Sequence, residues 1–188
     1  MTSQLPRCAL DEFPGLERPG DDDLSLLERQ LGRNPRGEVY VARRCPRGIP
    51  AVILTVPFDN EGRPTPPLLW LSCPYACREA ARLENERAVR RFSESLARAG
   101  EDALRFEAEE ERFGLVQSEI ARSGGEVPTD RLRERGVAGG RQGSIKCLHA
   151  HLAYRLASGR GVVGGWCLDE IEQRTGCWCE KIPEACLT

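Results

Sequence analysis

Three apolar runs between residues 39 and 71 have the pattern of β-strands. Residues 39–42 (VYVA) and 51–56 (AVILTV) are rich in β-branched side chains, and residues 68–71 are LLWL. Such side chains favour extended backbone. Turn-forming residues separate the runs, at 45–48 (CPRG) and at 59–62 (DNEG). Because short connections join antiparallel neighbours, the pattern predicts a three-stranded antiparallel sheet whose middle strand is buried.

Helical periodicity dominates much of the remaining chain, where apolar positions recur three and four residues apart. The expected helices cover residues 21–31, 74–99, 101–122, 144–158 and 166–174. Scattered proline and glycine residues give residues 1–22 the pattern of a flexible tail. We therefore predict a single α+β domain over residues 23–188, in which a small three-stranded antiparallel sheet is covered by four or five helices.

Composition narrows the class of protein. The chain has 188 residues, of which 40% are hydrophobic and 30% charged, so it is neither a membrane protein nor a fully disordered chain. Its net charge of −2 and its low aromatic content of 6% make nucleic acid an improbable partner. The N-terminal segment has no apolar stretch of the kind that directs secretion. We therefore expect a cytoplasmic protein whose thiols stay reduced.

Nine cysteines are the most unusual feature of the composition. Cys45 and Cys73 each precede a proline and follow neighbouring strands, so their thiols are expected near each other. With Cys147 and a C-terminal cysteine such as Cys179, they would supply four soft ligands for zinc or an iron–sulfur cluster. If the segment around Cys147 is helical, His151 lies one turn away and can serve as a substitute ligand. No role is assigned to Cys77, Cys167, Cys177 and Cys186.

A second hypothesis is a metal-free enzyme that acts on a phosphorylated or carboxylated small molecule. Arg33, Arg36 and Lys146 would bind the anion and His149 would be the general acid or base. A glycine-rich loop carrying Arg141 leads into the expected helix start, where backbone N–H groups bind anions. Two further readings stay open: Cys147 as a nucleophile, and an interaction module whose cysteines fill the core. Whether the protein is an enzyme is left undecided.

Four segments between Gln30 and Gly159 carry a resemblance to a known family. They are QLGRNPRG, RCPRGIPAV, LLWLSCP followed by RLE, and IKCLHAHLAYRLASG. In this order they resemble an uncharacterised, mainly actinobacterial family, the domain of unknown function 501 (DUF501). The resemblance implies a cytosolic bacterial protein and brings no activity with it. Family members often carry a further histidine near position 154, where this chain has Tyr154. The positions that the family pattern emphasises are Arg33, Arg36, Cys45, Cys73, Cys147 and His149.

Overall fold

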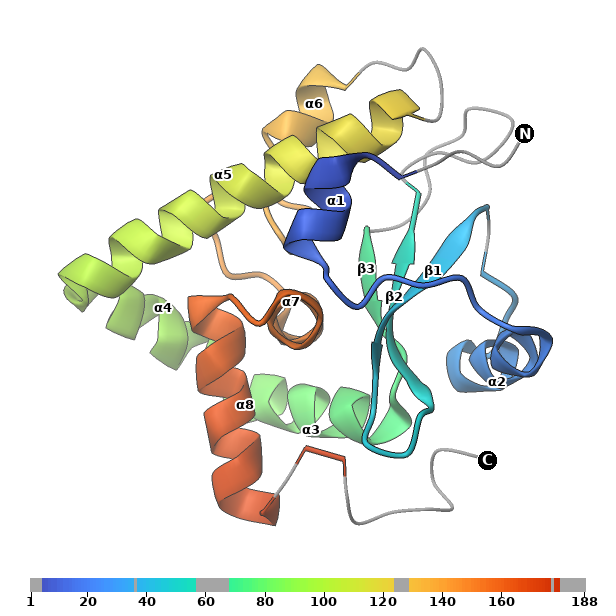
Figure 1. The fold of residues 1–188 in the computed structure, drawn as a ribbon. Coiled ribbons are helices and arrows are strands. Elements are labelled where there is room, and N and C mark those ends of the chain that lie inside the picture. Colours follow the sequence, from blue (N-terminus) through green and yellow to red (C-terminus); the bar gives the residue numbers. More distant parts are fainter. Residues whose placement is uncertain (1–4, 36, 57–67, 124–128, 177, 180–188) are drawn as a thin grey trace.

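The expected antiparallel sheet is present in the computed structural model, which describes residues 5–35, 37–56, 68–123, 129–176 and 178–179 (Figure 1). Its strands are β1 (Val39–Arg44), β2 (Pro50–Thr55) and β3 (Leu69–Leu71), in the order β1-β2-β3. Both neighbours pair antiparallel with β2, whose six residues are all buried. The α+β class and the three-stranded sheet predicted from the sequence are thus confirmed.

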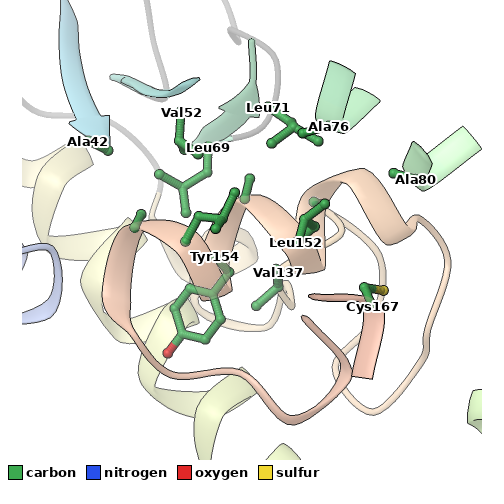
Figure 2. Close-up of a cluster of buried hydrophobic side chains, with 14 of the residues drawn as sticks. Ala42, Val52, Leu69, Leu71, Ala76, Ala80, Val137, Leu152, Tyr154 and Cys167 are labelled. Atoms are coloured by element: carbon green, nitrogen blue, oxygen red, sulfur yellow. The ribbon is translucent and has the colours of Figure 1, made fainter. Parts of the chain in front are cut away.

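Alternate side chains of β2 pack on opposite faces of the sheet. Val52 belongs to the large core, together with Leu152 of helix α7 (Leu148–Ser158), as Figure 2 shows. Ile53 packs instead with Leu27 of helix α2 (Asp21–Leu31) in a smaller apolar cluster. The sheet therefore separates α2 from α7, because side chains alternate between the two faces of a strand.

The described residues contain eight helices, more than the four or five expected. They are α1 (Arg7–Glu12), α2, α3 (Pro74–Asn85), α4 (Ala88–Arg98), α5 (Gly100–Ser123), α6 (Asp130–Arg133), α7 and α8 (Val162–Thr175). The single helix expected over 74–99 is divided at Arg87, whose φ of 61° is left-handed and interrupts the helix. No helix within the described ranges combines the length and apolar character needed to span a membrane.

Helix α7 lies at the centre of the fold, with α3, α5, α8 and the sheet around it (Figure 1). It begins at Leu148 rather than at the expected Ser144. The Ser144 hydroxyl does not cap the helix, because it donates to the carbonyl of Arg141 at 2.7 Å. Helix α8 also begins earlier than expected, since the Glu109 carboxylate of α5 accepts the N–H groups of Gly161 and Val162, each at 2.9 Å.

Residues 7–13 pack against the core, in contrast to the flexible tail expected for residues 1–22. Phe13 is fully buried and meets the ring of Tyr154 edge-on, with 6.3 Å between ring centroids. The buried Glu12 carboxylate accepts a hydrogen bond from the Tyr154 hydroxyl at 2.6 Å and forms an ion pair with Arg112. These partners are more than 90 residues away in sequence, so no local pattern indicated that the segment would be ordered.

Candidate metal centre

Glu84, Cys147 and His149 bring three different donor atoms together. Glu84 lies near the end of α3, Cys147 directly precedes α7, and His149 is in the first turn of α7. One carboxylate oxygen, one sulfur and one ring nitrogen lie within 4.8 Å of one another. The side chains of Glu84 and His149 are about one-third exposed, at 30% and 31%, so solvent reaches the group.

The start of α7 explains this geometry. Cys147 has extended backbone, with φ −143° and ψ 116°, and its side chain makes no capping hydrogen bond. The Glu84 carboxylate takes that role from α3, because its Oε1 accepts the N–H of Leu148 at 2.7 Å. A carboxylate at a helix N-terminus satisfies a free N–H group and favours the helix dipole. The capping contact therefore holds Glu84 beside Cys147 and His149.

His149 faces both of its neighbours with the same nitrogen. Its Nδ1 lies 3.8 Å from the Cys147 sulfur and 3.2 Å from Glu84 Oε1. Hydrogen bonding with Cys147, and the negative charge of Glu84, raise the pKa of His149 to about 9. In a catalytic triad the carboxylate of the acid bonds one ring nitrogen of the histidine, and the nucleophile bonds the other. Here the carboxylate and the sulfur approach the same nitrogen instead, a geometry that differs from a triad and gathers three atoms of the types that bind metals.

His151 does not take part in this group. Its side chain is buried and lies against Phe106 of α5, with 5.8 Å between ring centroids. Its Nε2 has no hydrogen-bond partner among the described residues, and burial lowers the pKa of the ring to about 4. The expected pairing of His151 with Cys147 assumed that both lie on one helix. Because the helix begins after Cys147, His149 takes that place.

Two further thiols flank the group and are held neutral. The Cys77 thiol donates to the carbonyl of Leu71 at 3.1 Å, and burial raises its pKa to about 12. Burial also raises the pKa of Cys167. In each case the nearby Cys147 adds to the rise. At neutral pH both side chains therefore remain thiols, which pack as small apolar groups.

The other three cysteines expected as ligands meet at one edge of the sheet. Strands β1 and β3 both end beside the start of β2, where the N–H of Cys45 bonds Ile49 and that of Cys73 bonds Ala51. The Cys179 thiol is a neighbour of those of Cys73 and Cys45, and all three residues are buried. Interaction with these two thiols and burial raise the pKa of Cys179. Cys177 and Cys186 lie outside the described residues.

The described residues that were expected to bind an anion are not all gathered in one place. The Arg33 guanidinium lies over the Trp70 ring, 5.3 Å from its centroid, on the face of the sheet that α2 covers. His149 lies on the opposite face, beside α3, so these two do not share a cleft. Arg36 is outside the described residues. Arg141 and Lys146 are both exposed and belong to the loop before α7.

Glu84 was missed by the sequence analysis. It is the acidic residue of the RLE segment that follows LLWLSCP, which was noted only as part of the family resemblance. Nothing in its local pattern distinguishes it from the many exposed glutamates of the helices. Its position within a shared motif was the one signal that pointed to a role.

A family model described as a protein of unknown function (DUF501) matches residues 41–169. The matched range includes Glu84, Cys147 and His149, as well as Cys45 and Cys73, and ends before Cys179. Comparison with curated proteins and with solved structures gives no match.

Proposed function

We propose that this chain, which belongs to the DUF501 family of proteins of unknown function, binds a divalent metal ion through Glu84, Cys147 and His149. The proposal is supported above all by the convergence of sulfur, nitrogen and oxygen donors within 4.8 Å. Zinc accepts all three ligand types at bond lengths of about 2.0–2.3 Å. Thiolate and imidazole together favour zinc over magnesium or calcium, which prefer oxygen ligands.

The surroundings of the group favour a site that is both oriented and accessible. The N–H of Leu148 fixes the Glu84 carboxylate at 2.7 Å, and such contacts around metal ligands preserve their geometry. Three protein ligands leave a fourth position of a tetrahedral ion for water or a substrate, as in catalytic zinc sites. With about one-third of the Glu84 and His149 side chains exposed, that position would face solvent.

The experiment is a zinc titration of protein freed of metal with a chelator and kept reduced, read by competition with a chromophoric chelator. We expect one zinc ion per chain and a loss of affinity of at least about tenfold in Cys147→Ser and in Glu84→Gln. Cobalt(II) in place of zinc should give an absorption band from cobalt–thiolate bonding that Cys147→Ser lacks.

Cys8→Ser is the matched control, because Cys8 is a partly exposed cysteine on α1, outside the group. Thermal melting of each variant establishes that it is folded. Zinc binding that is equally tight in Cys147→Ser and in the wild-type chain would contradict the proposal.

The cluster of Cys45, Cys73 and Cys179 is a second candidate for a soft metal ion. The proximity of Cys179 to the other two thiols favours it. Burial opposes it, because it raises the pKa of the Cys179 thiol, and a metal ion binds the deprotonated form. A second equivalent of zinc that disappears in Cys179→Ser but persists in Cys147→Ser would support this site. A single equivalent that is lost only in Cys147→Ser would assign the three thiols to core packing.

Iron–sulfur clusters usually need four cysteine ligands, and the geometry favours zinc for this reason. The group of converging donors in the described part of the chain contains Cys147 but none of the other three expected cysteines. An iron–sulfur cluster in protein purified without oxygen would be visible as brown colour and charge-transfer absorption, and would replace the zinc proposal.

A further inference from the structure

A hollow of about 740 Å³ lies between α6 and the loop that leads to α7. Three arginines line it, Arg131, Arg135 and Arg141, against a single carboxylate, that of Glu134. All four of these residues are exposed. The lining therefore carries an excess of positive charge, although the chain as a whole has a net charge of −2.

These arginines differ from many others on the surface. Arg90 pairs with Glu94, and Arg91 with Glu170, each at 2.8 Å. Within the ranges that the structure describes, no carboxylate lies at salt-bridge distance from Arg131, Arg135 or Arg141. Guanidinium groups without an internal partner are available to an anion from solution.

Lys146 adds a fourth positive charge beside the hollow. Its side chain crosses Gly140, where a Cβ atom would lie 2.6 Å from Lys146 Cδ and 2.7 Å from Nζ. The absence of a side chain at Gly140 thus makes room for the lysine. Arg141 and Lys146, both predicted from the sequence to bind an anion, therefore meet at this hollow, together with two arginines that were not predicted.

The wall of the hollow is held in place by the core. The Gln142 side chain donates to the carbonyls of Arg133 at 2.8 Å and of Glu110 at 3.3 Å. The N–H of Gly136 bonds the carbonyl of Gly140 at 3.0 Å, and that of Val137 bonds the buried Glu110 carboxylate at 3.1 Å. A loop tied down in this way loses little conformational freedom when a ligand binds.

We propose that this hollow binds a small molecule that carries two or more phosphate groups. Guanidinium groups pair with phosphate oxygens through two parallel hydrogen bonds. The volume is within the range of about 300–1,000 Å³ typical of small-molecule sites, and a single phosphate would fill little of it. No aromatic residue lines the hollow in the described chain, which disfavours single-stranded nucleic acid, since its bases stack on aromatic rings.

The experiment is isothermal titration calorimetry of metal-free protein with inorganic tripolyphosphate, and with inorganic phosphate for comparison. This site goes beyond the metal-binding proposal and does not depend on it, so the two experiments can fail separately. We expect one saturable site for tripolyphosphate, weaker binding of phosphate, and a Kd that rises with sodium chloride concentration. Arg131→Gln and Arg141→Gln should each raise the Kd by about tenfold.

Arg47→Gln is the matched control, since it removes the same charge from an exposed residue in the turn between β1 and β2. Arg141→Lys keeps the charge but loses the two parallel hydrogen bonds, and should weaken binding as well. Gly140→Ala changes no charge but displaces the flexible Lys146 side chain, and should also raise the Kd. Circular dichroism and thermal melting establish that each variant is folded.

Three results would overturn the proposal. The first is an absence of saturable tripolyphosphate binding at low salt. An equal loss of affinity in Arg47→Gln and Arg141→Gln would show that only net charge matters. Tighter binding of an oligothymidylate than of tripolyphosphate, lost in the same arginine variants, would assign the hollow to nucleic acid.

Discussion

Replacing Glu110 with glutamine is expected to change how the stability of the protein depends on pH. Glu110 is only 1% exposed and lies beneath the loop that forms the hollow. Burial raises the pKa of its carboxyl group from the ordinary value of 4.5 to about 7. Hydrogen bonds from the N–H groups of Val137 and Gly143 oppose this rise, and the charge of Glu109 adds to it.

The sign follows from comparing proton binding in the two states. Between pH 4.5 and pH 7 the folded chain keeps a proton on Glu110 that the unfolded chain releases. The stabilisation is therefore fully present below pH 4.5 and is lost as the pH rises to about 7. Each tenfold change in the acid dissociation constant of Glu110 corresponds to about 1.4 kcal/mol. The rise of its pKa from 4.5 to about 7 therefore corresponds to a loss of about 3 kcal/mol in the free energy of unfolding. Glutamine does not ionise, and Glu110→Gln should lack this dependence.

The assay is urea unfolding at several pH values between 4.5 and 8, followed by tryptophan fluorescence. The free energy of unfolding of Glu110→Gln, relative to the wild-type chain, should rise by about 3 kcal/mol between pH 4.5 and pH 7. Glu111→Gln, at an exposed position on the same helix, controls for removing a carboxylate and should show no such rise. A difference between Glu110→Gln and wild type that is the same at every pH would refute the reasoning.

Four other substitutions test the packing around α7. Gly164→Ala should lower the free energy of unfolding by about 2 kcal/mol or more, because its Cβ would lie 2.2 Å from the His151 carbonyl oxygen. Gly165→Ala should be neutral or stabilising by about 1 kcal/mol, because its Cβ would meet only the Arg155 guanidinium at 4.0 Å. Urea unfolding of both variants measures the difference between their free energies of unfolding. Glu12→Ala should cost about 3 kcal/mol in the same assay because it leaves buried polar groups without their partner, and a loss below about 1 kcal/mol would show that α1 contributes little to stability. His151→Leu removes a buried nitrogen that has no partner among the described residues, so the free energy of unfolding should change by less than about 1 kcal/mol. Its zinc affinity should equal that of the wild-type chain, and weaker zinc binding would identify His151 as a ligand.

The sequence by itself determined where most strands and helices lie. The β-branched run over 51–56 predicted the buried middle strand, which the structure places at Pro50–Thr55. The helix predicted over residues 21–31 has these bounds in the structure, and the next residue, Gly32, has the left-handed φ of 67° that glycine adopts without strain. The apolar pattern also predicted α5 almost to its ends. These features depend on backbone preferences and on the periodicity of burial, and both are local properties of the chain.

The tertiary structure alone decided which side chains meet. Glu84 caps α7 from 64 residues away and so completes the group with Cys147 and His149, and Glu109 caps α8 from 52 residues away. Glu12 orders α1 through Tyr154, which is 142 residues away. Local capping rules missed the starts of both helices, because in each case the capping carboxylate comes from another helix. Such contacts depend on how the elements pack in space, and residue spacing along the chain does not encode that arrangement.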